Sequence, residues 1–237
     1  VSVTGVTYDT TAPGFSSLSP STGSTVNTSA VGYTLSEAIA SGTVTYTRTG
    51  GTADGNVHTV SLLGTETNSG TKSYAVLRFA PSLVNGSIYT IAFNGTDVAG
   101  NSATEVSVTG VTYDTTAPGF SSIRPYSFSI VNTSAVGYTL SEALASGTVT
   151  YRRTGGTTDG THTVNLAGTE LNSGTRASAV LTNAPTLVDG SIYTIAFNGT
   201  DAAGNSVTEL SVMGVTYDKT PPAFSSLSPS TGSTVNT

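Results

Sequence analysis

The sequence predicts an all-β protein built from tandem antiparallel β-sandwiches, and two observations carry that prediction. The first is a repeat: VSVTGVTYDTTAP at Val1–Pro13 returns unchanged at Val106–Pro118, 105 residues later. A period of that size is too long for a solenoid turn or a propeller blade, but it suits one whole domain. The second is the short runs in which apolar and polar residues alternate, with no helical periodicity anywhere.

The repeat divides the chain into two complete copies and two partial ones. An altered version of the repeated motif, LSVMGVTYDKTPP, begins at Leu210. The complete copies therefore span residues 10–114 and 115–218, and each is large enough to form its own core. Residues 1–9 are predicted to be the last strand of a preceding repeat, and residues 219–237 to contain the first strand of a third.

In the first copy, the strands follow from runs of alternating residues separated by turn residues. Seven are predicted, at Phe15–Leu18, Ser29–Glu37, Thr43–Thr49, His58–Leu63, Ser73–Phe79, Ser87–Asn94 and Val106–Tyr113. The polar segment SPSTGSTVNT after the first strand is predicted to be a turn region. The GGTADG segment after the third strand carries the Asp-Gly pair that is typical of a hairpin.

Within these strands, the alternation predicts which side chains face the core. The inward residues are expected to be Val31, Tyr33, Leu35, Val44, Tyr46, Ala75, Leu77, Phe79, Tyr89, Ile91 and Phe93. In the last strand, the apolar positions change phase across Gly110, which predicts a β-bulge. Seven half-apolar strands in about 105 residues are best buried as a sandwich.

The sixth strand carries a more specific signal. The spacing of Asp189, Gly190, Tyr193 and Ile195 resembles the sequence signature at the sixth strand of immunoglobulin domains. Ile195 stands in place of the cysteine of that signature. The resemblance implies immunoglobulin-like sandwiches with a tyrosine corner, in which the ring of Tyr89 or Tyr193 is buried and its hydroxyl bonds to nearby backbone. The tryptophan of that family is missing, so Tyr46 and Tyr151 are expected to fill its space.

Several acidic residues are expected to meet at one end of each sandwich. In an immunoglobulin topology, the chain entrance and the loops after the second and sixth strands lie at the same end. Carboxylates that cluster repel one another unless a cation compensates, and Ca²⁺ prefers oxygen ligands. The sequence therefore predicts a calcium site at each junction between repeats, formed in the two copies by Asp9, Glu37, Asp97 and Asn101, and by Asp114, Glu142, Asp201 and Asn205.

A simpler interpretation of these residues remains open. Asp97 and Asn101 can cap a turn around Gly100, and Asp9 can form an Asx-turn. Among the other acids, Asp54 and Asp159 are expected to be plain hairpin residues. Exposed strand or loop positions are expected for Glu66, Glu105, Glu170 and Glu209.

Three motifs together resemble the bacterial Ig-like domains that are strung in many copies along large surface adhesins. These are the DTTAP opening, the LSE that ends a strand, and the TDxAGN loop. The resemblance covers both complete and both partial copies. It implies an extracellular spacer on a bacterial surface, which calcium stiffens at the junctions in some members, and it implies nothing about a ligand.

Composition and motifs limit the other functions. The net charge of −6 argues against nucleic acid or an anionic membrane as a partner, no apolar run can cross a membrane, and the absence of cysteine excludes disulfides. No nucleophile elbow or HExxH motif accompanies His58 or His162, so the chain is predicted not to be an enzyme.

The expected partners are neighbouring repeats and, by strand pairing, another copy of the chain. The alternative function is a carbohydrate- or protein-binding module, since Tyr126 and Phe128 replace Ser21 and Gly23 of the first copy and form an apolar patch. The same two side chains can equally cover the junction between repeats, and the sequence leaves both interpretations open.

Overall fold

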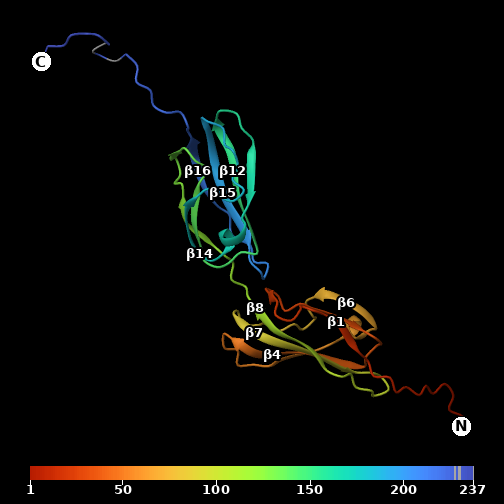
Figure 1. The fold of residues 1–237 in the computed structure, drawn as a ribbon. Coiled ribbons are helices and arrows are strands. Elements are labelled where there is room, and N and C mark those ends of the chain that lie inside the picture. The colour runs from red at the N-terminus through yellow and green to blue at the C-terminus, as the bar shows by residue number, and fades with distance from the viewer. Residues whose placement is uncertain (227, 229–230, 237) are drawn as a thin grey trace. The chain divides into compact units, whose positions relative to one another are not determined.

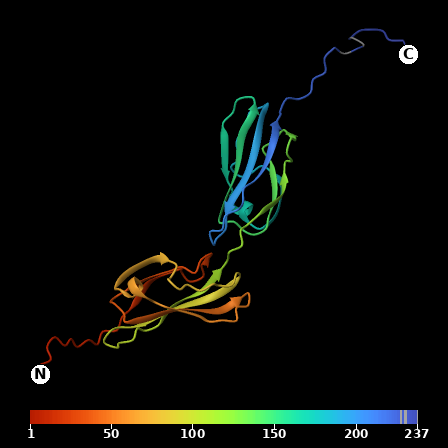
Figure 2. The same cartoon turned by 180° about the vertical axis from the view of Figure 1, so that it is seen from behind.

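The computed structural model describes residues 1–226, 228 and 231–236. It divides the chain into two compact units, one of residues 1–118 with 200–207, the other of residues 119–199 with 208–237. Strands make up almost all the regular structure of both units (Figures 1 and 2). In the described part of the chain, no helix has the length and apolar character that crossing a membrane needs.

The first unit is a sandwich of a three-stranded and a five-stranded sheet. Its strands are β1 (Phe15–Ser19), β2 (Thr25–Val26), β3 (Val31–Leu35), β4 (Ser41–Gly51), β5 (His58–Ser61), β6 (Gly70–Ala75), β7 (Ser87–Thr96) and β8 (Val106–Tyr113). One sheet has the order β1-β3-β6 and the other β2-β8-β7-β4-β5. A single 3₁₀ turn, η1 (Gly64–Thr67), connects β5 to β6. The predicted fold class, an antiparallel immunoglobulin-like sandwich, is confirmed.

The second unit has the same topology. Its strands are β9 (Phe120–Arg124), β10 (Ile130–Val131), β11 (Val136–Leu140), β12 (Ser146–Gly156), β13 (Thr161–Asn165), β14 (Gly174–Ala179), β15 (Ser191–Thr200) and β16 (Leu210–Tyr217). The sheets have the orders β14-β11-β9 and β10-β16-β15-β12-β13. A second 3₁₀ turn, η2 (Gly168–Leu171), precedes β14.

The core of each unit lies between its sheets and centres on aromatic rings. In the first unit, Phe15, Tyr33 and Phe93 come from three strands and pack with ring centroids 5.5–6.0 Å apart. The expected inward residues of β3, β4 and β7 are all buried. Alternation therefore identified the core faces of these strands correctly, since each strand has one face against the opposite sheet.

The predicted strand at Ser73–Phe79 is wrong in its boundaries and partly in its facing. Strand β6 ends at Ala75, and both Ala75 and Phe79 are exposed, whereas Leu77 is buried. A turn closed by the bond from Ala80 N–H to the Leu77 carbonyl follows the strand. The alternation of apolar and polar residues continues into this turn, where it no longer predicts which side chains are buried.

After β1 the chain crosses from the three-stranded to the five-stranded sheet, where it forms β2. The sequence did not predict this crossing. Part of the predicted turn region SPSTGSTVNT forms β2, which pairs in parallel with β8. The predicted bulge is present: between β7 and β8 the register shifts, and Gly110 has a φ of 68°. A positive φ at this position favours glycine because it has no Cβ.

None of the described residues in the two partial copies lies in a strand. The apolar side chains Val1, Val3, Val6 and Tyr8 are exposed, and so is Phe224. Leu227, the end of the predicted first strand of a third repeat, lies outside the described residues.

Candidate functional site

In the first unit, three acidic side chains from distant parts of the sequence come together. Asp9 precedes β1, Glu37 follows β3, and Asp97 follows β7. Each offers a carboxylate oxygen, and these three oxygens lie within 4.8 Å of one another. They border a surface hollow that Thr7, Ala38 and Val98 also line. The predicted convergence of the three carboxylates is therefore found in this unit.

Hydrogen bonds hold Asp97 in place. Its Oδ1 accepts from Asn101 N–H and its Oδ2 from Asn101 Nδ2–H, both at 2.8 Å. The same amide nitrogen of Asn101 donates to the Asp9 carbonyl at 3.2 Å. The side-chain amide nitrogen of Asn101 thus donates to both Asp97 and Asp9. These bonds orient the loop after β7 and connect it to the segment that enters the domain.

The simpler interpretation is also visible. Asp9 Oδ1 accepts from Thr11 N–H at 2.9 Å, an Asx-turn, and Gly100 N–H donates to the Asp97 carbonyl at 3.4 Å. The turns and the convergence of the carboxylates therefore coexist: the Asp9 turn uses one oxygen of its carboxylate, and the bond from Gly100 uses the backbone carbonyl of Asp97.

The electrostatics of the cluster are unfavourable for a third negative charge. Burial raises the pKa of Glu37, and the neighbouring Asp9 and Asp97 raise it further. The hydrogen bond from the Asn101 side chain lowers the pKa of Asp97, which keeps that group ionised. A bound cation would relieve this repulsion.

The donor set fits a calcium ion. Ca²⁺ bonds to oxygen at about 2.3–2.6 Å, so two ligands on opposite sides of one ion lie about 5 Å apart. The 4.8 Å limit on the oxygens of Asp9, Glu37 and Asp97 is compatible with that span. These three side chains are the residues that would hold the ion.

The second set of predicted residues repeats the same local structure. Asn205 donates through its N–H and Nδ2–H to Asp201, at 2.8 and 2.9 Å, and through Nδ2–H to the Asp114 carbonyl at 2.9 Å. Asp201 is buried like Asp97. Glu142 follows β11 in the second unit as Glu37 follows β3 in the first.

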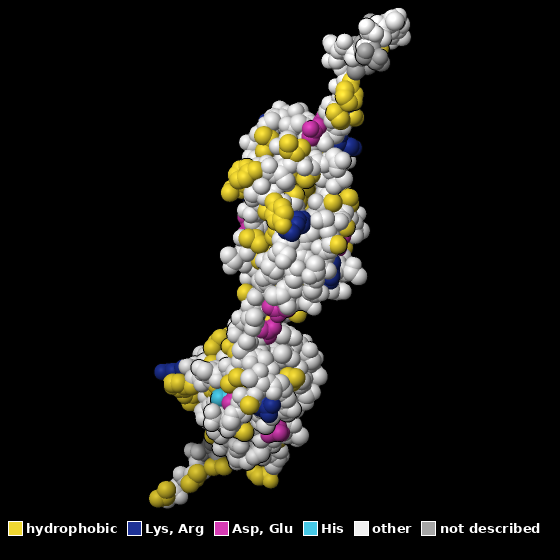
Figure 3. All heavy atoms as spheres, turned by 90° about the vertical axis from the view of Figure 1, so that its left-hand side faces the viewer, with side chains coloured by type: hydrophobic (Ala, Val, Ile, Leu, Met, Phe, Trp, Pro, Cys, Tyr) yellow, Lys and Arg dark blue, Asp and Glu magenta, His cyan; other side chains and the backbone are white. Residues whose placement is uncertain are grey.

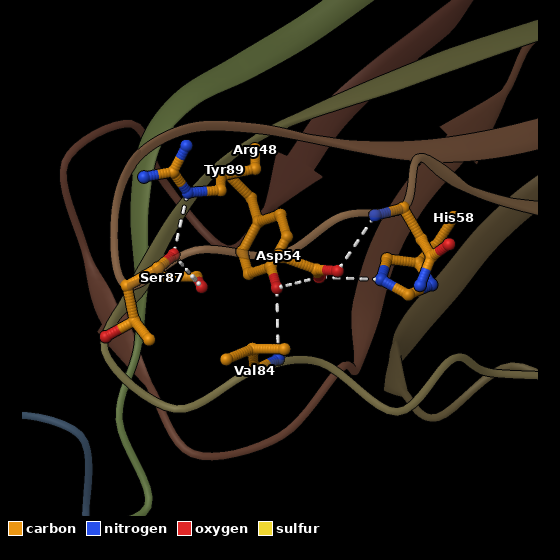
Figure 4. Close-up of polar contacts among 8 residues, drawn as sticks. Arg48, Asp54, His58, Val84, Ser87 and Tyr89 are labelled. Atoms are coloured by element: carbon orange, nitrogen blue, oxygen red, sulfur yellow. Dashed lines mark hydrogen bonds and ion pairs between the residues drawn. The ribbon is translucent and has the colours of Figure 1, made fainter.

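A buried polar network at the tyrosine corner was not predicted. Tyr89 donates its hydroxyl hydrogen to Asp54 Oδ2 at 2.6 Å and accepts from Val84 N–H at 3.0 Å (Figure 4). His58 Nε2 lies 2.8 Å from the same Asp54 oxygen. Tyr89 is buried, as predicted, and its hydroxyl does bond to backbone, but its second partner is the carboxylate of Asp54.

Asp54 therefore does more than shape a hairpin. Its Oδ1 accepts from Asn56 N–H at 3.1 Å, a turn contact, but its side chain is only 3% exposed. The hydrogen bond from Tyr89, followed by that from His58, lowers the pKa of Asp54 to about 2. Nothing in the local sequence distinguishes this Asp-Gly from an ordinary turn, because its partner Tyr89 lies 35 residues away.

The second unit reproduces the network. Tyr193 donates to Asp159 Oδ2 and accepts from Val188 N–H at 3.2 Å, and His162 Nε2 lies 2.9 Å from the same Asp159 oxygen. The hydrogen bond from Tyr193 is the main cause that lowers the pKa of Asp159 to about 2. In both units the histidine thus has a structural partner.

Glu66 and Glu170 also differ from the expectation of exposed charges. Glu66 accepts from Leu63 N–H at 2.8 Å and from Arg78 N–H at 3.0 Å, and is partly buried. Glu170 accepts from Ala167 N–H and Thr182 N–H, each at 2.8 Å. These glutamates tie η1 and η2 to the segments after β6 and β14. Glu105 and Glu209 are exposed, as expected.

Comparison with known proteins finds one family model that matches part of the chain. Residues 9–112 match the model of the bacterial Ig-like domain. Among curated proteins, none matches this sequence. A similar solved structure is described as a tetra-tandem repeat in the extending region of a large adhesion protein. Its identity to this chain is 21% and its TM-score 0.30, and the alignment covers 86% of this chain but 48% of the other.

Proposed function

We propose that the chain is a spacer segment in the stalk of a large extracellular adhesin on a bacterial surface. Residues 9–112 match the bacterial Ig-like domain, and residues 115–218 repeat the strands, the core and the loops of that part of the chain. The observation that carries this proposal is the repetition of a complete, separately cored domain within one chain. Repetition of whole domains adds length and distance between the ends, and it does not by itself create a new site.

The stalk proposal makes a length prediction. Strands of 7–10 residues rise about 3.3 Å per residue, so each repeat should add roughly 23–33 Å of reach. An additional copy of residues 10–114, inserted after Asp114, should therefore increase the maximum dimension in small-angle X-ray scattering by about that amount. A maximum dimension that does not grow, with the domains packed side by side, would reject the spacer role.

The finer part of the proposal is that Ca²⁺ stiffens the stalk. Three converging carboxylates around Asp97 and the raised pKa of Glu37 support it. When bound, the ion would supply positive charge that neutralises the cluster. The protein would contribute the rest: the loop that Asn101 orients brings Asp97 to Asp9, so the ion would connect the chain entrance to the loop after β7.

Scattering and thermal melting with calcium and with EDTA test this part separately. We expect calcium to raise the melting temperature and to narrow the distribution of dimensions. Asp97→Asn should weaken the response at the first set of residues and Asp201→Asn at the second, whereas the exposed Glu105→Gln is the matched control. Identical melting and scattering in calcium and EDTA would reject calcium stiffening while leaving the length prediction untouched.

A further inference from the structure

The two repeats differ in a coordinated way at one edge of the sandwich. At four corresponding positions, the first repeat has small or polar residues and the second has large apolar ones. The pairs are Ser21 and Tyr126, Gly23 and Phe128, Thr25 and Ile130, and Thr109 and Met213. Since the repeats share their fold, the first repeat shows that the sandwich forms without these apolar side chains.

In the second unit, the four replaced residues lie on neighbouring segments. Ile130 begins β10, the edge strand of the five-stranded sheet, and the main chain of Phe128 donates to the Met213 carbonyl at 2.8 Å. Their exposed fractions are 61% for Tyr126, 78% for Phe128, 70% for Ile130 and 55% for Met213. Figure 3 shows hydrophobic side chains gathered on one face of this unit, with a basic side chain beside them.

Phe128 occupies a backbone position that is unfavourable for it. Its φ is 63°, and Gly23 at the corresponding position of the first repeat has a φ of 77°. Glycine adopts this conformation without strain, whereas a bulky residue does not. Folding therefore favours glycine here, and an exposed phenylalanine at a strained position suggests a role outside the fold.

A positive charge accompanies the apolar residues. Arg124 replaces Ser19 of the first repeat, and its guanidinium carbon lies 3.8 Å from the centre of the Tyr126 ring. One of its nitrogens donates to the Ile123 carbonyl at 3.0 Å. Among the described residues, no carboxylate forms an ion pair with Arg124. Its charge is therefore available to an anionic group of a ligand.

The size of the patch argues against a stable protein interface. The four apolar side chains expose on the order of 500 Å², which is within the range of functional surface patches. A standard protein–protein interface buries roughly 800 Å² on each partner. A second copy of this chain would thus need much more surface than the patch offers, whereas a ligand of a few rings would fit.

We propose that Arg124, Tyr126, Phe128, Ile130 and Met213 form a binding site for an acidic saccharide on the second repeat. The apolar C–H face of a sugar ring would pack on the exposed aromatic and aliphatic side chains. The planar guanidinium of Arg124 suits a sugar carboxylate, because it can donate two parallel hydrogen bonds. The serines that flank Phe128 hold the patch together: Ser129 donates its hydroxyl hydrogen to the Tyr126 carbonyl at 2.7 Å, and Ser127 Oγ accepts from Met213 N–H at 3.1 Å. This site adds a binding function to one repeat of the spacer.

The test is an NMR titration of the whole chain with a linear hexamer of galacturonic acid. Its fully methyl-esterified form has the same rings without the charge and serves as the matched ligand control. We expect shift changes confined to residues 123–131 and 210–216, and at least 10-fold weaker binding of the ester. Raising the salt concentration should weaken binding of the acid and not of the ester.

The first repeat supplies the control variants. Changing the patch to its residues (Tyr126→Ser, Phe128→Gly, Ile130→Thr, Met213→Thr) should abolish binding at an unchanged or higher melting temperature. Arg124→Ser alone should remove the preference for the acid over the ester. Absence of binding, or shift changes that persist in the four-residue variant, would overturn the proposal. So would sedimentation that shows self-association of the chain, lost in that variant, since the patch would then bind a second copy.

Discussion

In these cores, the hydroxyl groups of buried tyrosines form hydrogen bonds to the backbone of connecting segments. Tyr33 donates to the Glu66 carbonyl at 2.8 Å and Tyr46 to the Ser29 carbonyl at 2.7 Å. Burial raises the pKa of both. Each hydroxyl satisfies a carbonyl on a connecting segment, so the core aromatic also fixes a loop. Tyr46, expected to fill the tryptophan space, is fully buried.

Replacing the corner tyrosine should destabilise the second unit. Tyr193→Phe removes the hydroxyl that donates to Asp159 and leaves that carboxylate without its main donor. Hydrogen bonds to charged groups contribute about 1.5–3 kcal/mol, so we expect a loss of about 2 kcal/mol in the free energy of unfolding, measured in urea. Tyr126→Phe, at an exposed ring, is the control and should change nothing; equal effects of both would contradict the network.

The same network makes stability depend on acid pH. The pKa of Asp54 and of Asp159 is about 2 in the folded protein, below the roughly 3.9 of an unfolded chain. A lowered pKa stabilises the fold above the unfolded value, and that stabilisation is lost as the pH falls from about 4 to about 2.

We therefore expect the urea midpoint to fall over this pH range, and to fall less in a variant with Asp54→Asn and Asp159→Asn. The variant should also be less stable at pH 6. A wild-type midpoint that stays constant from pH 5 to pH 2 would contradict the assignment.

At the scale of elements, the loop between β4 and β5 depends on how closely it approaches β7. Gly51, the last residue of β4, has a φ of 67°, and a Cβ there would lie 2.0 Å from the carbonyl oxygen of Gly86, the residue before β7. At Gly55, in the loop that follows β4, an added Cβ would have nothing within 4 Å. The close approach places Asp54 beside Tyr89, so the glycine at residue 51 supports the network indirectly.

Two alanine substitutions test this difference. Gly51→Ala should cost at least 1–2 kcal/mol, the approximate penalty for a left-handed L-residue, with more from the contact with Gly86. Gly55→Ala should be neutral within about 0.5 kcal/mol. Thermal unfolding of both variants gives the comparison, and equal melting temperatures would show that the loop approaches β7 less closely.

For the whole molecule, the first eight residues are a candidate for strand pairing. Val1–Tyr8 has the same sequence as β8, yet its valine side chains are exposed. A segment with an apolar face and unpaired backbone groups can add to the edge of another sheet. We predict that it pairs with another copy of the chain, so that association increases with concentration in sedimentation velocity. Deleting residues 1–8 should abolish it, whereas Ser2→Ala should not; association that survives the deletion would contradict this role.

The sequence by itself determined the repeat, most of the strands, and the core faces of β3, β4 and β7. Alternation along a strand is a local property, and a strand between two sheets must place every second side chain inward. Hence Val31, Tyr33 and Tyr89 were assigned to the core correctly, and the bulge at Gly110 was predicted from a change of phase. The three carboxylates around Asp97 were predicted because the resemblance supplied the topology, and that topology brings their loops to one end.

Only the tertiary structure decided what the non-local partners do. Asp54 has the sequence of a turn residue but meets Tyr89 from a strand 35 residues later, and Glu66 meets Arg78 N–H from beyond β6. The two residues of β2 became a strand only because β8 lies beside them. In each case a hydrogen-bond partner comes from a distant segment. Composition and spacing report neighbours along the chain, whereas burial and hydrogen bonding depend on neighbours in space.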